Sequence, residues 1–209
     1  MGNCCQAAVN LLLQKNPASS PPLEQSAVGF DPKYHSPHIS VTNKRKTAEG
    51  SATGGTVLCD TPIDQLRAFW EFTLEDLGSG SGQFAVGVMR RANLKPPPND
   101  NHVLSRCFDP NDERTKCLSS NEAGVTFTKG DTVGVALDMN YKRLTFYMNG
   151  VSMQVEIKLS PKFSAPFPCV QLANGVRIRA NFQGPFDCFP TNDLNPQNYD
   201  GIVAARSIL

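Results

Sequence analysis

Apolar and polar residues alternate with a period of two in five segments of the chain, and this pattern restricts the possible folds more than any other feature. The five segments are residues 70–75, 84–89, 133–139, 144–148 and 176–182. In the first of them, Trp70, Phe72 and Leu74 are separated by single polar residues. Successive side chains of a strand point to opposite faces, whereas a helix would scatter these apolar residues around its circumference. The pattern therefore predicts half-buried β-strands.

Turn residues separate the predicted strands. Asn149-Gly150 directly follows the 144–148 strand, and both residues tolerate a positive φ, which is typical of a two-residue hairpin. Residues 138–142 form another short connection, and Gly78 to Gly82 reads as a flexible hairpin loop before the 84–89 strand. With many short strands and no helical segment between them, the chain is predicted to be an all-β sandwich.

Composition argues against several partners. The chain has 20 basic and 19 acidic side chains, a formal charge of +1, and no clustered basic face of the kind that nucleic acid requires. Its seven cysteines are an odd number without a CxxC pair, and His35 and His38 have no metal-ligand spacing around them. We therefore expect no nucleic-acid partner, no metal and no disulfide framework. No apolar run is long enough to cross a bilayer as a helix.

Nothing in the sequence indicates catalysis. The cysteines and histidines are scattered and carry no local nucleophile signature. A phosphate-binding loop leads into a helix, but the Gly78–Gly82 segment leads into a predicted strand. We expect a protein that is not an enzyme, with no cofactor and no small-molecule substrate. Trp70 is predicted to pack in the core, and Glu71 and Asp138 to hold turns or face solvent.

The segment KGDTVGVALDMNYKRLTFYMNG, residues 129–150, resembles the central signature of the SPRY domain family. Further motifs follow in family order: GFDP and PHISVTNKRKTA, then TVLCDTPI and AFWEFTLED with Trp70-Glu71, then QFAVGVMRR, and finally PFPCVQLANGVRIRANFQGPF. Two features depart from the family. Tyr141-Lys142 stands where Asn-Gly is usual, and a tryptophan-rich stretch is represented only by residues 106–108.

The resemblance implies a bent sandwich of two antiparallel sheets that presents loops from one end to a peptide or protein. It places the SPRY domain at residues 27–189. Residues 1–26, rich in Pro and Ser after a short apolar patch, are expected to be a flexible arm. Residues 190–209 are expected to form an extension that either packs over the surface of the domain or is poorly ordered.

The partner-binding residues are expected in two loops of that end. One follows the 84–89 strand and contributes Arg90, Arg91 and Asn93, and the other is the Asn174-Gly175 turn of a predicted 169–182 hairpin. Paired arginines suit an acidic or carbonyl-rich peptide, because each guanidinium donates hydrogen bonds in a fork. The alternatives are that these arginines are solvated surface charges, or that Arg177 and Arg179 on a sheet face bind the partner.

The first residues, MGNCC, suggest a lipid anchor. Gly2 is the acceptor position for N-myristoylation, and Cys4 and Cys5 are adjacent candidates for palmitoylation. Gln6 stands where the myristoylation pattern prefers Ser or Thr, so an unmodified tail is the alternative. The expected protein is a lipid-anchored interaction module at the cytoplasmic face of a membrane, or a cytoplasmic one without the anchor. The competing hypothesis is a structural, self-assembling membrane-associated component.

Overall fold

The computed structural model describes residues 27–79, 82–90 and 115–204, which form twelve strands and no helix. The strands are β1 (Phe30–His35), β2 (Ile39–Thr42), β3 (Thr47–Gly50), β4 (Gly55–Cys59), β5 (Arg67–Leu77), β6 (Phe84–Met89), β7 (Thr115–Ser119), β8 (Thr132–Asp138), β9 (Arg143–Met148), β10 (Val151–Lys158), β11 (Phe167–Leu172) and β12 (Val176–Asn181). All five segments with alternating apolar residues are strands, as predicted. Two of them, β6 and β8, are buried on both faces and are not the half-buried strands that the alternation predicts.

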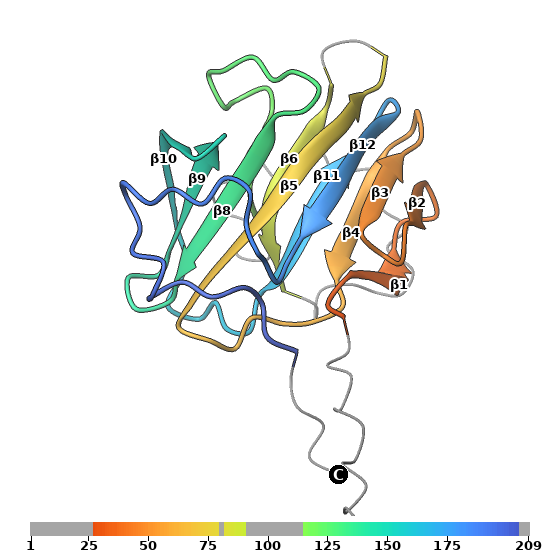
Figure 1. Ribbon diagram of the computed structural model, residues 1–209. Helices are drawn as coiled ribbons and strands as arrows, with labels where there is room; N and C mark the ends of the chain where they lie inside the picture. Colours follow the sequence, from red (N-terminus) through yellow and green to blue (C-terminus); the bar gives the residue numbers. More distant parts are fainter. Residues whose placement is uncertain (1–26, 80–81, 91–114, 205–209) are drawn as a thin grey trace, which may run out of the picture.

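Two antiparallel sheets lie face to face (Figure 1). The five-stranded sheet has the order β1-β4-β11-β6-β7, and the seven-stranded sheet has the order β10-β9-β8-β5-β12-β3-β2. Strands that follow one another in the chain often belong to different sheets, so many connections cross the sandwich. The predicted all-β sandwich is confirmed.

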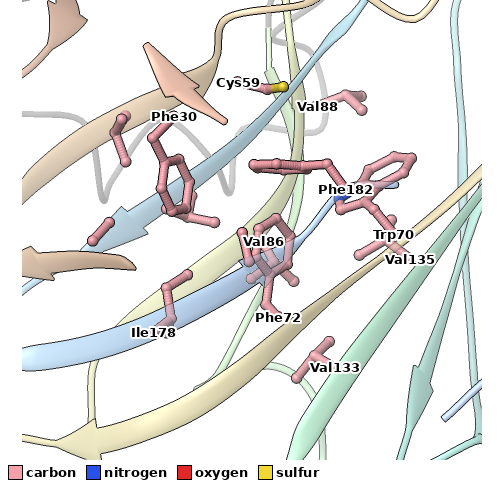
Figure 2. Packing of buried hydrophobic residues seen from close by; sticks show 14 of the residues in the cluster. Phe30, Cys59, Trp70, Phe72, Val86, Val88, Val133, Val135, Ile178 and Phe182 are labelled. Atoms are coloured by element: carbon pink, nitrogen blue, oxygen red, sulfur yellow. The ribbon is translucent and has the colours of Figure 1, made fainter. Parts of the chain in front are cut away.

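The core lies between the two sheets. Figure 2 shows Trp70 and Phe72 of β5 among side chains from both layers, including Phe30 and Phe182. The Phe182 ring meets the Phe30 and Phe72 rings edge to face, at centroid distances of 5.4 and 5.9 Å. Such pairs are favourable because the positive edge of one ring faces the negative face of another. Trp70 is fully buried, as its place in the alternating pattern predicts.

One predicted hairpin is confirmed and two are wrong. Asn149-Gly150 joins β9 to β10, with Val151 opposite Met148. The 169–182 segment is not a hairpin, because β4 and β6 occupy both edges of β11 and β12 must join the other sheet. The Gly78–Gly82 connection is not a hairpin either, since β8 and β12 occupy both edges of β5. Both connections are crossovers between the sheets.

The segment after β12 covers part of the outer face of the seven-stranded sheet. Phe69 lies on that face, and its ring centroid is 4.9 Å from those of Phe186 and Phe189. The chain then returns to β5, where Asp200 pairs with Ala68 in an isolated parallel bridge. The outer face of β5 is therefore covered at Phe69 and Glu71, while Thr73 and Glu75 further along it are partly exposed, and this cover explains why Phe69 is fully buried.

The sandwich has two ends that carry different connections. We call one the loop end; it carries the β1–β2, β3–β4, β5–β6, β7–β8, β9–β10 and β11–β12 connections. We call the other the terminal end; it carries the β2–β3, β4–β5, β8–β9 and β10–β11 connections. The described chain also enters at Ala27 and leaves at Ala204 on the terminal end (Figure 1).

Candidate protein-interaction surface

At the loop end, Asn174 connects three loops through its backbone. Its carbonyl oxygen accepts hydrogen bonds from the backbone nitrogen of Ser79 at 2.9 Å and from the Ser79 hydroxyl at 3.4 Å. Its own nitrogen donates to the carbonyl of Ser51 at 2.9 Å, and its side-chain amide donates to Gln83 at 3.4 Å. The β3–β4, β5–β6 and β11–β12 connections are thereby held in one arrangement.

Both residues of this turn adopt a left-handed backbone, with φ of 55° at Asn174 and 83° at Gly175. Asparagine and glycine tolerate this conformation better than other residues. A Cβ atom on Gly78 would lie 1.9 Å from the Asn174 carbonyl oxygen, so only glycine permits the contact between the two loops. The backbone conformation of this turn and its contact with Gly78 therefore explain why asparagine and glycine occupy these three positions, apart from any role in binding.

A second hydrogen-bonded cluster at the loop end is centred on Asp131. Its carboxylate accepts hydrogen bonds from the Asn149 side chain at 2.9 Å and from the Thr128 backbone nitrogen at 2.7 Å. Burial by itself would raise the pKa of Asp131, but these hydrogen bonds outweigh it and lower the pKa below its usual value. Asn149 also accepts from the Thr132 backbone nitrogen at 2.8 Å, so the cluster fixes the β9–β10 turn against the β7–β8 loop.

Apolar side chains are exposed beside these two clusters. Val151, just after the β9–β10 turn, has 69% of its surface exposed, and Val125 in the β7–β8 loop has 36%. The loops also present the exposed polar residues Ser51, Ser79 and Gln83. The surface thus combines a few apolar contacts with hydrogen-bonding groups, which is the usual composition of a protein-interaction surface.

The predicted site residues do not come together. Arg90 directly follows the end of β6 at the terminal end, beside Met89, which pairs with Phe167 and Thr115. Asn174 and Gly175 lie at the other end of β6, about 20 Å away for a strand of this length. The expectation that Arg90 shares one end with Asn174 and Gly175 is wrong, because β6 runs the full height of the sandwich between them. Arg91 and Asn93, and the proposed lipidation sites Gly2, Cys4 and Cys5, lie outside the described residues.

Arg177 and Arg179, the alternative binding residues, lie on β12 among acidic neighbours. The guanidinium of Arg177 is 3.7 Å from Glu49 and 3.5 Å from Glu75, and that of Arg179 is 3.5 Å from Glu75. These partly exposed pairs contribute little to stability. They do neutralise the arginines, so this face offers no excess of positive charge to an acidic partner.

The structure assigns Glu71 a role that the sequence did not specify. The side chain is buried, and its carboxylate accepts hydrogen bonds from the backbone nitrogens of Asp187 at 3.0 Å and Cys188 at 2.7 Å. Burial raises the pKa of Glu71 above its usual value although both hydrogen bonds act to lower it. Glu71 therefore holds the C-terminal segment, and the prediction that it might face solvent is wrong. Its position next to Trp70 was the only signal in the sequence.

The described residues present no arrangement that suggests catalysis. They contain no group of three His, Cys, Asp or Glu side chains that could hold a metal ion. The thiols of Cys59, Cys117 and Cys169 are buried, and burial raises the pKa of Cys59 and Cys169 far above the usual range of a thiol. In these same residues there is also no helix long and apolar enough to cross a membrane.

Comparisons with known proteins agree with this architecture. The SPRY domain family matches residues 67–185. A stretch of 78 residues is 33% identical to the E3 ubiquitin-protein ligase RKP of Arabidopsis thaliana, covering 35% of this chain and 6% of the ligase. The chain therefore corresponds to only a small part of that protein's length.

Two solved structures have a similar fold. The SPRY domain of human HERC1 is 20% identical and superposes with a TM-score of 0.50, covering 73% of this chain and 96% of that domain. Stonustoxin is 17% identical and superposes with a TM-score of 0.52, covering 74% of this chain and 27% of the toxin. At these levels of identity the likeness concerns the fold alone.

Proposed function

The chain belongs to the SPRY domain family, and we propose that within this family of protein-interaction modules it binds a peptide or protein surface through its loop end. One observation carries the proposal. The backbone of Asn174 ties three loops of that end into a single arrangement before any partner is present. A surface that is already ordered loses less entropy on binding than loops that must first be fixed.

The exposed groups of the loop end suggest the chemistry of the partner. Val151 offers an apolar contact, and Gln83 and Ser79 offer hydrogen-bonding groups beside it. An extended peptide with one apolar side chain and free backbone amides would match this combination. The described residues of this surface include no group of His, Cys, Asp and Glu side chains that could hold a metal ion, and we propose binding without chemical conversion.

A selection from a random-peptide display library tests the proposal, followed by titration of the selected peptide. We expect Val151→Ser and Gln83→Ala each to weaken binding by about tenfold, the loss expected for one well-packed contact. Arg90→Ala is the matched control, because Arg90 is at the opposite end of β6. If Arg90→Ala abolishes binding and both loop-end variants bind normally, the partner uses the segment after β6 and the loop-end assignment is wrong.

We also propose that the module is tethered to a cytoplasmic membrane face by acylation of Gly2 and of Cys4 or Cys5. The support is chemical: one myristoyl chain gives marginal membrane binding, and a second acyl chain makes it stable. In the native cell, the full-length protein should sediment with membranes and Gly2→Ala should release it. A Cys4→Ser/Cys5→Ser variant should leave weak, reversible attachment. Equal distribution of all three forms would favour the unmodified tail.

A further inference from the structure

Three large apolar side chains are exposed at the terminal end. Leu66 has 64% of its surface exposed, Tyr141 has 69% and Val203 has 47%. They come from three separate segments: the β4–β5 connection, the β8–β9 turn and the C-terminal segment. We call these three residues the apolar triad.

Hydrogen bonds hold the segments of the apolar triad together. The Leu66 carbonyl accepts a hydrogen bond from the backbone nitrogen of Met139 at 2.8 Å, just before Tyr141. The side chain of Gln65, next to Leu66, accepts from the Val203 nitrogen at 3.3 Å and donates to the Gly201 carbonyl at 2.8 Å. The triad therefore belongs to one rigid part of the surface.

Basic side chains outnumber acidic ones at the terminal end. The described connections of this end and Arg90 supply six basic side chains: Lys44, Arg45, Lys46, Arg90, Lys142 and Lys162. The same described connections and the C-terminal segment from residue 199 supply three acidic ones, Asp60, Asp64 and Asp200, of which Asp60 pairs with Arg45. The connections of the loop end, in the described part of the chain, supply Lys129 against Glu122 and Asp131. The two ends therefore differ in charge, and the basic end is the one with the triad.

Two details place charge next to the apolar groups. The guanidinium of Arg143 lies 5.1 Å from the centre of the Tyr141 ring, so this exposed ring has a cation over its face. The ammonium group of Lys142 reaches the carbonyl of Phe163 at 3.4 Å, which brings it beside the connection that carries Lys162. Neither lysine pairs with a described carboxylate.

We propose that the terminal end lies against the surface of an anionic lipid bilayer, with the apolar triad inserted between headgroups and Lys142 and Lys162 facing lipid phosphates. Tyrosine and leucine side chains flanked by basic residues are favourable at this interface. The point of chain entry supports the same occupant, because residues 1–26 join the fold at Ala27 on this end. The inference rests on the proposed tethering, and it adds a direct contact between the folded domain and lipid.

This orientation has a consequence for partner binding. The loop end is at the far side of the sandwich, about 20 Å from the terminal end along β6. A module lying on lipid through the triad would therefore present Asn174 and its three loops to the cytoplasm.

Flotation of the full chain with vesicles tests the contact without the anchor, because Gly2→Ala removes the myristoylation site. With vesicles that contain phosphatidylserine in large excess over the protein, we expect a fraction of this protein to float, and none to float with phosphatidylcholine alone. The contact is too weak by itself to hold Gly2→Ala on the membranes of the cell. A Leu66→Ser/Tyr141→Ser/Val203→Ser variant should reduce the fraction bound by about tenfold or more, and Lys162→Ala should reduce it roughly fivefold. Val151→Ser is the matched control: it removes a side chain as exposed as Tyr141, but at the loop end, and should bind as before.

Three outcomes would overturn the proposal. Flotation that the triple variant leaves unchanged would assign any lipid contact to residues 1–26. If Val151→Ser reduced flotation as much as the triple variant does, the lipid contact would not be specific to the terminal end. An absence of flotation, with a dimer by light scattering that the triple variant converts to a monomer, would make the triad an interface between two copies. The selected peptide should bind the triple variant normally, so this test fails independently of the loop-end proposal.

Discussion

Replacement of Glu71 should detach the C-terminal segment from the seven-stranded sheet. The carboxylate is buried and accepts hydrogen bonds from two backbone nitrogens, those of Asp187 and Cys188. Hydrogen bonds to a charged group contribute about 1.5–3 kcal/mol each, so two of them correspond to about 3–6 kcal/mol. The raised pKa means that burial destabilises the charged carboxylate, relative to the protonated form, by more than the two hydrogen bonds stabilise it. We therefore expect Glu71→Ala to lower the free energy of unfolding by a smaller amount, about 2–3 kcal/mol.

The raised pKa also fixes the sign of a pH effect. Between the usual pKa of about 4.5 and the higher value in the folded protein, the native state holds a proton that the unfolded state has lost. The contribution of Glu71 to stability therefore falls as the pH rises through this window. Glu71→Gln keeps an acceptor oxygen but does not titrate, so it should be less harmful than Glu71→Ala and should lack this fall.

Urea unfolding of the wild type and both variants, repeated at several pH values from about 4.5 upward, measures these effects. Limited proteolysis adds a local readout, because cleavage within residues 186–204 should accelerate in Glu71→Ala before the rest of the fold is cut. A loss below about 1 kcal/mol for Glu71→Ala would refute the hydrogen-bonding argument. Parallel pH profiles for the wild type and Glu71→Gln would refute the assignment of the titration to Glu71.

Three further substitutions probe the turns and the close contacts. Asp138→Asn should lower the free energy of unfolding by about 2 kcal/mol near neutral pH. Hydrogen bonds outweigh burial and lower the pKa of Asp138, so the wild type should lose this stability as the pH falls below about 3.8, and the variant should not show that loss. Urea titrations across that pH range measure both effects. Asn174→Ala should cost about 1–2 kcal/mol for its φ of 55°, whereas Asn174→Gly should unfold in urea as the wild type does. Gly87→Ala should cost about 3 kcal/mol or more, because the new Cβ would lie 2.1 Å from the Lys116 carbonyl oxygen. Gly130→Ala is the control, because no atom would lie within 4 Å of its new Cβ, and it should cost only about 1 kcal/mol for its φ of 96°. A similar drop in the melting temperature of the two glycine variants would contradict this reasoning.

The alternation of apolar residues predicted the strands because it reports a local property, the face on which a side chain lies. Trp70 and Phe72 are on the inner face of β5, as the pattern requires. Phe69 shows where the pattern stops being informative. It lies on the outer face and is equally buried, because Phe186 and Phe189, more than a hundred residues later, cover it. No period within β5 encodes that cover.

The two Asn-Gly turns show why the candidate site could not be assembled from the sequence. At Asn149-Gly150 the chain folds back on β9, because the edge of β9 away from β8 is free for β10. At Asn174-Gly175 the same dipeptide follows β11, whose two edges are taken by β4 and β6, so the chain must leave for the other sheet. The outcome depends on strands that are distant in sequence, and a local turn signal holds no information about them. The antiparallel pairing of β11 with β6, with Leu172 opposite Phe84, places Asn174 at the end of β6 away from Arg90, and so separates two residues that the sequence analysis had grouped. Residue types thus identified the turns correctly, while the pairing of strands decided which turns share a surface.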